Sequence, residues 1–250
     1  ENAQPKTYEF MKAPAKFDIV YEDKNIILID KKPGIIVHQD KSYHFDSLVA
    51  RVQHYLYDKG EYNPEEDKSF SPALVNRIDR NTGGIVIAAK NAESLRILNQ
   101  KMKTRELEKF YLCLLYRKPK KDYDILRGNI TKNEAKNKVS VFKKEVEGSK
   151  EIRTKYKILD FNGKYSLAEI ELITGRTHQI RAHMASIGHP LVGDTKYSNK
   201  KAPDGFKYQA LYSYKLKFNF TEAAGNLEYL NGKEFEVKRV WFAKNNHISL

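Results

Sequence analysis

The sequence predicts an α+β fold built on a mixed, mainly antiparallel sheet with flanking helices. Segments with strand character outnumber segments with helical periodicity. Successive strand candidates are joined by short turns, and Asn162-Gly163 between two apolar segments favours a two-residue hairpin. Strands do not alternate regularly with crossover helices, as a parallel α/β sheet would require. These three observations favour antiparallel neighbours.

The chain is expected to begin with a short extension and to continue as one domain. Pro5 and Pro14 interrupt residues 1–16, which we interpret as an arm or linker before a domain over residues 17–250. Residues 26–37 contain two β-branched segments on either side of a Pro-Gly turn, which predicts two strands.

Helices and strands follow in the next segment. Apolar residues at helical spacing predict a helix over 47–57, and a polar composition predicts a surface loop over 61–71. An apolar run predicts a buried strand over 85–89. Asn91 is a suitable N-cap for the helix that its following residues predict.

The C-terminal half is expected to be richer in strands. Residues 110–116 predict a strand, and residues 156–161 and 165–173 predict the two arms of the Asn-Gly hairpin. Thr177 is the expected N-cap of a short helix that ends at Gly188.

Composition predicts a folded, basic protein. The chain has 250 residues, 40% of them hydrophobic, which is enough apolar material for a core. Its formal net charge of +13 points to a polyanionic partner. The single cysteine, Cys113, excludes an internal disulfide and a multi-cysteine zinc site, and its apolar neighbours predict a buried thiol.

Location and cofactors follow from what the sequence lacks. No segment has the roughly 18 to 20 consecutive apolar residues of a membrane span, and the N-terminus has no signal-peptide core, so we expect cytoplasmic residence and no membrane partner. A monomer is the default expectation. The glycine-rich loops that bind nucleotide phosphates are also missing, so no nucleotide cofactor is indicated.

A first candidate for chemistry is the segment over residues 75–84. Asp79 lies between Arg77 and Arg80 in a turn before the apolar strand. Neighbouring cations favour the ionised carboxylate, which then serves as a nucleophile or base. The alternative is an aspartate that organises the turn, with both arginines in solvent.

A second candidate segment starts at Gly175. Arg176, His178, Gln179 and Arg181 lie within seven residues near a predicted helix start, where they can bind a phosphate or pair with a carboxylate. A polar helix face is the alternative. A metal site is not expected, because His178 and His183 are five residues apart and so about 140° apart around a helix.

Taken together, these segments resemble the RluA family of RNA pseudouridine synthases over roughly residues 18–218. Several ordered motifs carry the resemblance: Tyr21-Glu22-Asp23, Gly34-x-x-Val37-His38, Asn76-Arg77-Ile78-Asp79 through Lys90, Lys109-x-Tyr111, and Gly175-Arg176-Thr177-His178-Gln179-Ile180-Arg181 through Gly193-Asp194.

The resemblance implies an isomerase with no cofactor and no metal, and a central catalytic cleft in residues 17–250. It assigns Asp79 as the essential aspartate, Tyr111 as the tyrosine that packs against the target base, and Arg181 as the arginine that pairs with the aspartate. In the implied reaction the C1′–N1 bond of a flipped-out uridine breaks and C1′ joins C5. The role of Asp79 stays open between attack on C1′, attack on C6 and removal of a ribose proton.

Two residues beside Asp79 depart from the family pattern. Position 76 is Asn where many members have His, and position 83 is Gly where Ser is usual. Both departures affect the hydrogen bonds of the loop, and so the substrate preference, but neither removes a residue that the implied chemistry requires. Many members also carry an N-terminal RNA-binding domain that has no counterpart in the printed sequence.

RNA is the expected partner, with ribosomal RNA favoured and transfer RNA as the alternative. The expected substrate-binding residues are Arg77, Arg80, Thr82, Arg176, His178, Gln179, Lys120 and Lys121. Residues 101–121, 131–157 and 196–217 hold the excess of positive charge, which suggests phosphate-binding tracks or merely solvated faces. Two other functions stay open: a catalytically silent RNA-binding protein, and an RNA hydrolase that uses Asp79 and His178.

Overall fold

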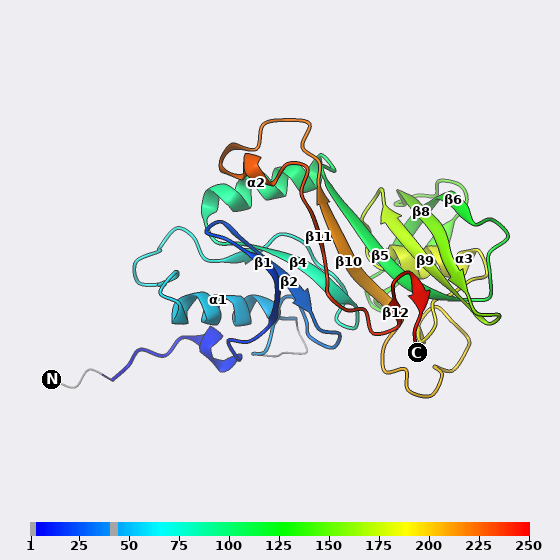
Figure 1. Cartoon of the computed structure of the whole chain (residues 1–250), viewed down its shortest axis with the longest axis horizontal. Coiled ribbons are helices and arrows are strands. Elements are labelled where there is room, and N and C mark those ends of the chain that lie inside the picture. Colours follow the sequence, from blue (N-terminus) through cyan, green and yellow to red (C-terminus); the bar gives the residue numbers. More distant parts are fainter. Residues whose placement is uncertain (1–3, 41–44) are drawn as a thin grey trace. The chain divides into compact units, whose positions relative to one another are not determined.

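The computed structural model describes residues 4–40 and 45–250. The first three residues of the predicted arm lie outside them. The chain forms two compact units (Figure 1). The first unit comprises Glu1–Glu106 and Phe218–Phe235, and the second comprises Leu107–Lys217 and Glu236–Leu250.

The first unit is built on antiparallel strands. Its strands are β1 (Asp18–Glu22), β2 (Ile26–Lys31), β3 (Ala73–Leu74) and β4 (Gly83–Ala89). Strand β2 pairs with β1 on one edge and with β4 on the other, and β3 also pairs with β4. Every residue of β4 is buried, as expected for a strand that is covered on both faces.

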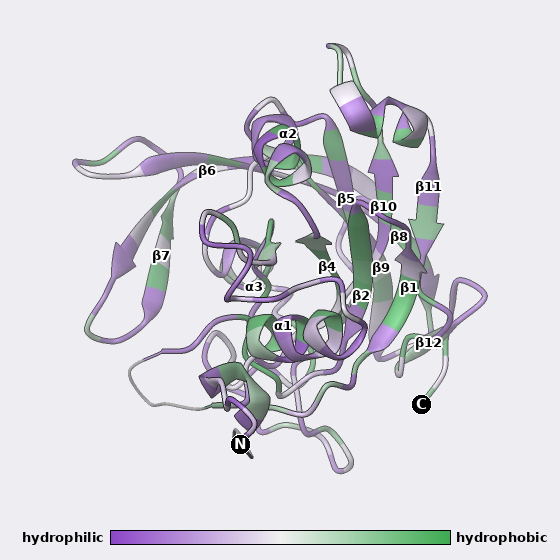
Figure 2. Cartoon of the chain, turned by 90° about the vertical axis from the view of Figure 1, so that its left-hand side faces the viewer, coloured by the Kyte–Doolittle hydropathy of each residue, from purple (hydrophilic) through white to green (hydrophobic). Residues whose placement is uncertain are grey.

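Two capped helices accompany these strands and confirm the sequence-based prediction. Helix α1 (Leu48–Asp58) begins after Ser47, whose side chain accepts a hydrogen bond from the Ala50 N–H. Helix α2 (Ala92–Lys103) begins after Asn91, which caps in the same way. Helix α1 is amphipathic, with hydrophobic and hydrophilic residues on different faces (Figure 2).

Part of the predicted arm packs on the first unit. It includes the short 3-10 helix η1 (Glu9–Lys12), and Phe10 contacts the buried cluster that contains Leu48 and Tyr62. Ala13 is 1% exposed. The division into an arm and one domain over 17–250 stays a prediction.

One predicted strand is wrong. Residues 35–37 do not pair back on β2, because both edges of β2 are already occupied by β1 and β4. The chain turns at Gly34, with φ +96°, and Ile36 forms only an isolated parallel bridge with Ser47.

The second unit contains a longer antiparallel sheet. Its order is β10-β5-β9-β8-β6-β7 (Figure 1). The strands are β5 (Leu107–Tyr116), β6 (Tyr123–Asn133), β7 (Lys138–Phe142), β8 (Lys150–Phe161), β9 (Tyr165–Leu172) and β10 (Leu211–Phe218). Gly163, with φ +90°, lies in the turn that joins β8 to β9, which confirms the predicted Asn-Gly hairpin.

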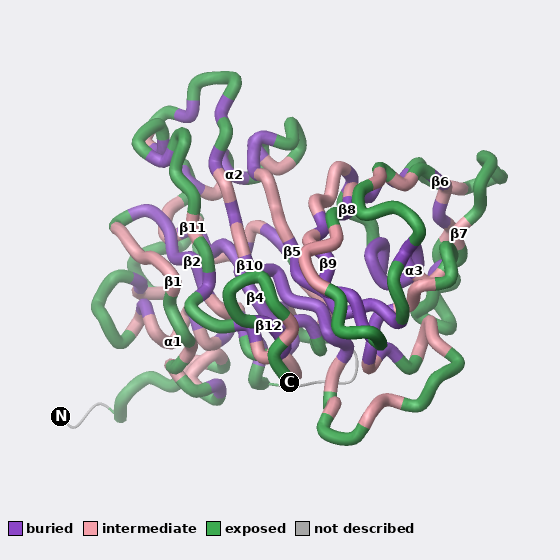
Figure 3. Tube along the Cα trace, turned by 45° about the vertical axis from the view of Figure 1, so that its right-hand side comes forward, coloured by how far each residue is buried: buried purple, intermediate pink, exposed green. Residues whose placement is uncertain are grey.

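The sequence did not predict β6, β7 or β10. Much of the β6–β7 hairpin is exposed (Figure 3), so apolar patterning there is weak. Short elements complete the described chain: η2 (Gly225–Leu230), β11 (Glu234–Glu236), β12 (Ala243–Lys244) and β13 (His247–Ile248).

Helix α3 (Gln179–Ser186) lies on one face of the second sheet. The His183 Nδ1 and Thr154 Oγ1 atoms are 2.7 Å apart, which fixes α3 to β8. The predicted cap Thr177 is wrong: the N-cap is His178, in a left-handed conformation with φ +53° and no side-chain cap bond. The Gln179 side chain accepts from the Arg176 N–H instead, so the turn is closed from inside the helix.

These features confirm the predicted α+β class with a mainly antiparallel sheet. Gly188, with φ +86°, follows the end of α3 as expected. Cys113 is fully buried, which confirms the predicted buried thiol, and burial raises its pKa. Within residues 4–40 and 45–250, no helix has the length and apolar character needed to cross a membrane.

Candidate active site

The segment around Asp79 connects β3 to β4. The Thr82 N–H donates to the Asp79 carbonyl at 3.0 Å and closes a turn just before β4. Asp79 is partly buried, while Arg77 and Arg80 are exposed. Thr82 itself is 1% exposed. The turn thus presents the carboxylate and the two arginines and keeps Thr82 inside.

A buried lysine holds this turn from behind. Lys31, the last residue of β2, is 1% exposed. Its Nζ donates to the carbonyls of Lys32 at 3.0 Å, Ile35 at 2.8 Å and Arg80 at 2.9 Å. An ammonium has three N–H donors, so the three carbonyls match it. We call this arrangement the Lys31 clamp.

A second pair of hydrogen bonds strengthens the clamp. The Gly34 N–H donates to the Arg80 carbonyl at 2.7 Å, and the Arg80 Nε donates to the Gly34 carbonyl at 3.2 Å. The residue after Asp79 is therefore fixed to the loop after β2. Nothing in the sequence marks Lys31 as buried, because a lysine at the end of a strand is usually exposed.

Burial also shapes the charge behind Asp79. Loss of hydration lowers the pKa of Lys31 to about 7, and the attraction of the Asp79 carboxylate opposes this shift. The Asp79 carboxylate therefore favours the charged form of Lys31, which burial disfavours.

Asn76 fixes the other side of the turn. It is 7% exposed, its Nδ2 donates to the Ile85 carbonyl at 3.2 Å, and its Oδ1 accepts from the Ile87 N–H at 2.8 Å. The amide thus pairs with β4 as a neighbouring strand would. An amide offers a donor and an acceptor side by side, which explains how Asn serves at this position.

Tyr111 lies in the second unit, on β5. Register pairs Tyr111 with Ile170 of β9 and Ile170 with Tyr156 of β8, and directly opposite residues share a face. Thr154, two residues before Tyr156, bonds to α3 and so lies on that face too. Tyr111 therefore lies on the face of the sheet that α3 covers, with 6% of its surface exposed.

Arg181 of α3 forms a two-pronged ion pair with Asp194. Its Nε lies 2.7 Å from Oδ2 and its Nη2 lies 3.2 Å from Oδ1. Asp194 is 2% exposed and also accepts from the backbone N–H groups of Lys196 and Tyr197. Burial alone would raise the pKa of Asp194, but Arg181 and these N–H groups hold it below its ordinary value.

Tyr197 links this ion pair to the start of α3. The Arg181 guanidinium lies 5.2 Å from the centre of the Tyr197 ring. The Tyr197 hydroxyl accepts from the Val139 N–H at 3.0 Å and is hydrogen-bonded to the His178 Nδ1 at 2.6 Å. Tyr197 was not predicted as a site residue, because no motif distinguishes it among the 16 tyrosines of the chain.

Gln179 holds the loop before α3. Its Oε1 accepts from the Thr174 hydroxyl at 2.9 Å and from the Arg176 N–H at 3.1 Å. Its Nε2 donates to the Arg153 carbonyl at 3.0 Å and to the Thr154 Oγ1 at 2.9 Å. All four hydrogen bonds of the amide are used within the protein, which leaves Arg176 exposed on a fixed loop.

Comparison with known proteins now identifies the family. The family model described as RNA pseudouridylate synthase matches residues 25–186, which include Asp79, Tyr111 and Arg181. The chain belongs to the RNA pseudouridylate synthase family.

Two curated relatives illustrate the match. An uncharacterized RNA pseudouridine synthase of Aquifex aeolicus is 33% identical over 201 residues, which cover 80% of this chain and 61% of the relative. The ribosomal large subunit pseudouridine synthase D of Borreliella burgdorferi is 32% identical over 203 residues, which cover 80% of this chain and 60% of the relative. The chain thus spans about 60% of the length of these relatives.

Solved structures support the fold. The structure of human RNA Pseudouridylate Synthase Domain Containing 4 has a TM-score of 0.69, with 19% sequence identity, and covers 88% of each chain. Human RNA Pseudouridylate Synthase Domain Containing 1 has a TM-score of 0.66, with 19% identity, and covers 88% of this chain and 82% of that one. The fold is that of the pseudouridine synthases.

The predicted site residues divide between the two units of this synthase-family chain. Asp79, Arg77, Arg80 and Thr82 belong to the first unit. The second unit holds Tyr111, Lys120, Lys121, Arg176, His178, Gln179 and Arg181. Their functional roles, including the pairing of Arg181 with Asp79, stay predictions.

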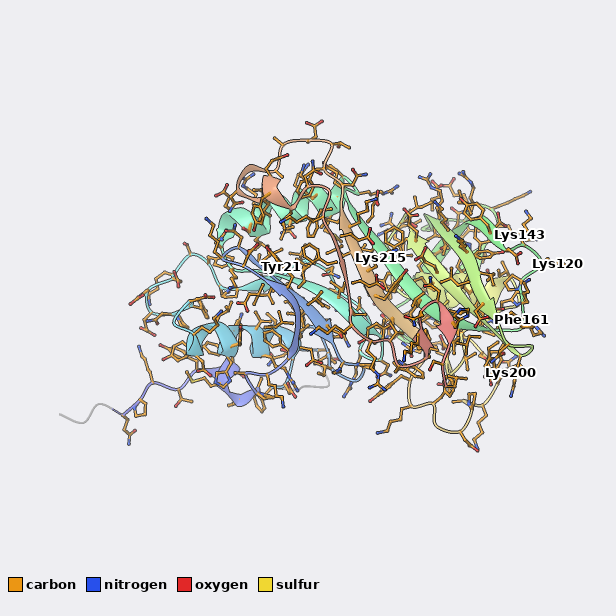
Figure 4. The ribbon with its side chains drawn as sticks, in the orientation of Figure 1. Tyr21, Lys120, Lys143, Phe161, Lys200 and Lys215 are labelled. Atoms are coloured by element: carbon orange, nitrogen blue, oxygen red, sulfur yellow. The ribbon has the colours of Figure 1, made fainter. Side chains whose placement is uncertain are left out.

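Not every lysine of the three predicted basic segments is available to bind RNA. Lys120 and Lys121 are exposed in the loop between β5 and β6, and Lys120 points outward in Figure 4. Lys101, counted in the first track, is 2% exposed and lies 2.9 Å from Glu106. It is unavailable to RNA, because its ammonium is used inside the first unit.

The clamp predicts a pH-dependent stability. Unfolded lysine titrates near 10.5 and Lys31 near 7, so the unfolded chain binds more protons between these values. The free energy of unfolding should therefore rise with pH over this window, by at most about 5 kcal/mol. In Lys31→Met this contribution is absent. Urea unfolding at pH 7 to 10 should show the wild type gaining stability over Lys31→Met. Parallel pH curves for the two proteins would contradict this, and exposed Lys244→Met should follow the wild type.

A side chain at Gly193 should lower the stability of the segment that supports Arg181, because Gly193 precedes Asp194, the partner of Arg181. Gly193 has φ +83°, and a Cβ there would lie 2.4 Å from the Tyr208 carbonyl oxygen. Gly163 has a similar φ of +90° with no atom within 4 Å. Gly163→Ala should cost about 1 kcal/mol of strain, and Gly193→Ala about 1–3 kcal/mol more because the backbone must also move. Equal losses in urea unfolding would show that the close approach is unimportant.

Proposed function

We propose that this protein converts specific uridines in RNA to pseudouridine. Membership in the RNA pseudouridylate synthase family is the observation that carries the proposal. The geometry of the turn supports it, since Asp79 is held before β4 by the Lys31 clamp and by Asn76. A preorganised carboxylate suits chemistry at a sugar or a base.

The reaction is an isomerisation in which atoms balance without a co-substrate. Asp79 initiates cleavage of the C1′–N1 bond as nucleophile or base. The uracil rotates, C1′ bonds to C5, the C5 proton leaves and N1 takes up a proton. Tyr111 is the candidate for the late proton transfer, since its hydroxyl can exchange a proton and its ring can pack on uracil.

The nucleotide must leave the RNA stack before this chemistry. Unstacking costs a few kcal/mol, which phosphate contacts elsewhere on the protein must offset. Arg77 and Arg80 are exposed beside Asp79, and a guanidinium can stack where a base has left. Arg176 and His178 complete the proposed substrate-binding set, together with the buried Thr82 and Gln179, which act through the turn and the loop that they hold.

Ribosomal RNA is the favoured substrate. A relative at 32% identity bears the name ribosomal large subunit pseudouridine synthase D. Transfer RNA is the alternative, and pseudouridine mapping of total RNA, with and without the protein, separates them. Cytoplasmic residence and a monomeric state are part of the same proposal.

Asp79→Ala tests the chemistry. The variant should form no detectable pseudouridine in RNA while its affinity for RNA stays within about twofold of the wild type, because one carboxylate is removed from a basic protein. Pseudouridine is measured by selective labelling, since the product has the mass of uridine. Asp204→Ala, an exposed aspartate of the second unit, is the control and should remain active.

Three results would contradict the proposal or the site. Activity that persists in Asp79→Ala would remove Asp79 from the chemistry. Binding of RNA without pseudouridine formation by the wild type would favour a silent RNA-binding protein. Release of free uracil or of new strand ends would favour a hydrolase.

Lys120 and Lys121 test the predicted RNA contacts. Changing both to Gln should weaken RNA binding and lower the slope of log affinity against log salt by about 1.5, because two phosphate contacts are lost. Single-turnover conversion at saturating protein should not change. The control is Lys238→Gln with Lys244→Gln, which removes two exposed charges outside the three basic segments. Equal salt slopes in the two double variants would show that Lys120 and Lys121 are ordinary solvated lysines without phosphate contacts.

A further inference from the structure

Three lysines in the first unit are withdrawn from water, and each has at least two partners within the protein. Lys31 donates to three carbonyls. The Lys90 side chain is 6% exposed and lies 2.6 Å from Glu22 and 2.9 Å from Glu61. Lys101 lies 2.9 Å from Glu106 and 2.7 Å from the Glu222 carbonyl. This is the expected pattern, because a desolvated charge is costly unless it is paired.

Lys109 on β5 breaks this pattern. It is partly buried, and loss of hydration lowers its pKa with no opposing carboxylate. Within residues 4–40 and 45–250, no hydrogen-bond or ion-pair partner reaches its ammonium. A lysine that has lost water and gained no anion is prepared for an anionic ligand.

The strand places Lys109 beside Tyr111. Alternate residues of a strand point to the same face, so both side chains lie on the face that α3 covers, about 6–7 Å apart along β5. Phe110, between them, points to the other face, where it lines a depression with Glu169 and Glu171. The lysine and the tyrosine thus address the same side of the sheet.

Gly175 keeps the ammonium of Lys109 reachable. Gly175 is exposed, and a Cβ built on it would lie 3.5 Å from the Lys109 Nζ. A side chain at this position would lie against the ammonium, whereas glycine places no atom there. The loop is rigid at this point, because the neighbouring Thr174 hydroxyl donates to Gln179. The exposed Arg176 adds a second cation one residue further on.

We propose that Lys109 binds a backbone phosphate of the RNA at the nucleotide whose uracil packs against Tyr111, and that Gly175 keeps the path to its ammonium open. This inference rests on the proposed function. Base and phosphate of one nucleotide are separated by its ribose, a span comparable with the distance between the two side chains. Lys109 would fix the sugar-phosphate backbone while the uracil is released and rejoined.

Substitutions at Lys109 provide the first test. Lys109→Met should lower kcat/KM for RNA by about 10- to 100-fold, mainly by raising KM, because one charged contact is lost. Its salt slope should fall by about 0.7 to 1. Lys109→Arg should recover much of the loss. Lys244→Met removes an exposed charge of the same unit and should behave as the wild type.

Gly175→Val removes access without removing charge. Gly175 has no positive φ, and a Cβ at 3.5 Å is an ordinary contact, so the variant should fold normally. It should raise KM as Lys109→Met does, and the double variant should be no worse than either single one. Normal KM in Gly175→Val would remove the glycine from the proposal.

RNA with an uncharged phosphate analogue tests whether Lys109 binds a phosphate beside the target uridine. A synthetic RNA is made around the mapped target uridine with a methylphosphonate at either of its two flanking phosphates. At one of them the wild type should lose about 10-fold or more in kcat/KM, while Lys109→Met should lose less than twofold. Equal losses in both proteins at both positions, or an unchanged KM in Lys109→Met, would overturn the inference. If the wild type forms no pseudouridine in any RNA, the proposed function fails instead.

Discussion

The buried ammonium of Lys31 is the interaction on which the first unit's candidate site depends. Its three carbonyl partners lie on two loops that are almost 50 residues apart in the sequence, at Lys32 and Ile35 and at Arg80. A buried charge with several fixed acceptors tolerates little movement, because each lost hydrogen bond leaves a desolvated group. The position of Asp79 therefore depends on Lys31, which is buried.

The second unit uses the same principle with different side chains. Gln179 holds the loop before α3 by four hydrogen bonds, and Asp194 holds Arg181 from behind by a buried ion pair. In both units a buried polar group orders a segment whose exposed residues are the candidates for RNA contact. Lys109 stands apart, because it is positioned by its strand and has no partner inside the described protein. The buried, paired groups thus hold the candidate site in place, whereas Lys109 is the group proposed to bind a phosphate.

Local sequence signals predicted what depends on neighbours in the chain. The helix α1, the Asn91 cap of α2, the Asn162-Gly163 hairpin and the buried strand at Ile85–Ala89 are such cases, since each is determined within a few residues. The strand expected at 35–37 failed because β2 had both edges occupied, and the Thr177 cap failed because Gln179 closes the turn. Both depend on residues that propensity does not weigh.

The sequence alone determined the fold class, the basic character and, through ordered motifs, the family and the candidates Asp79, Tyr111 and Arg181. Only the tertiary structure decided which charges are available. Lys101 and Lys120 look alike in the sequence, yet one is buried against Glu106 and the other is in solvent. The roles of Lys31 as a clamp and of Asn76 as a hydrogen-bonding partner of β4 also appear only in the folded chain. The physical reason is that hydration and pairing of a polar side chain are set by groups distant in sequence, which only folding brings together.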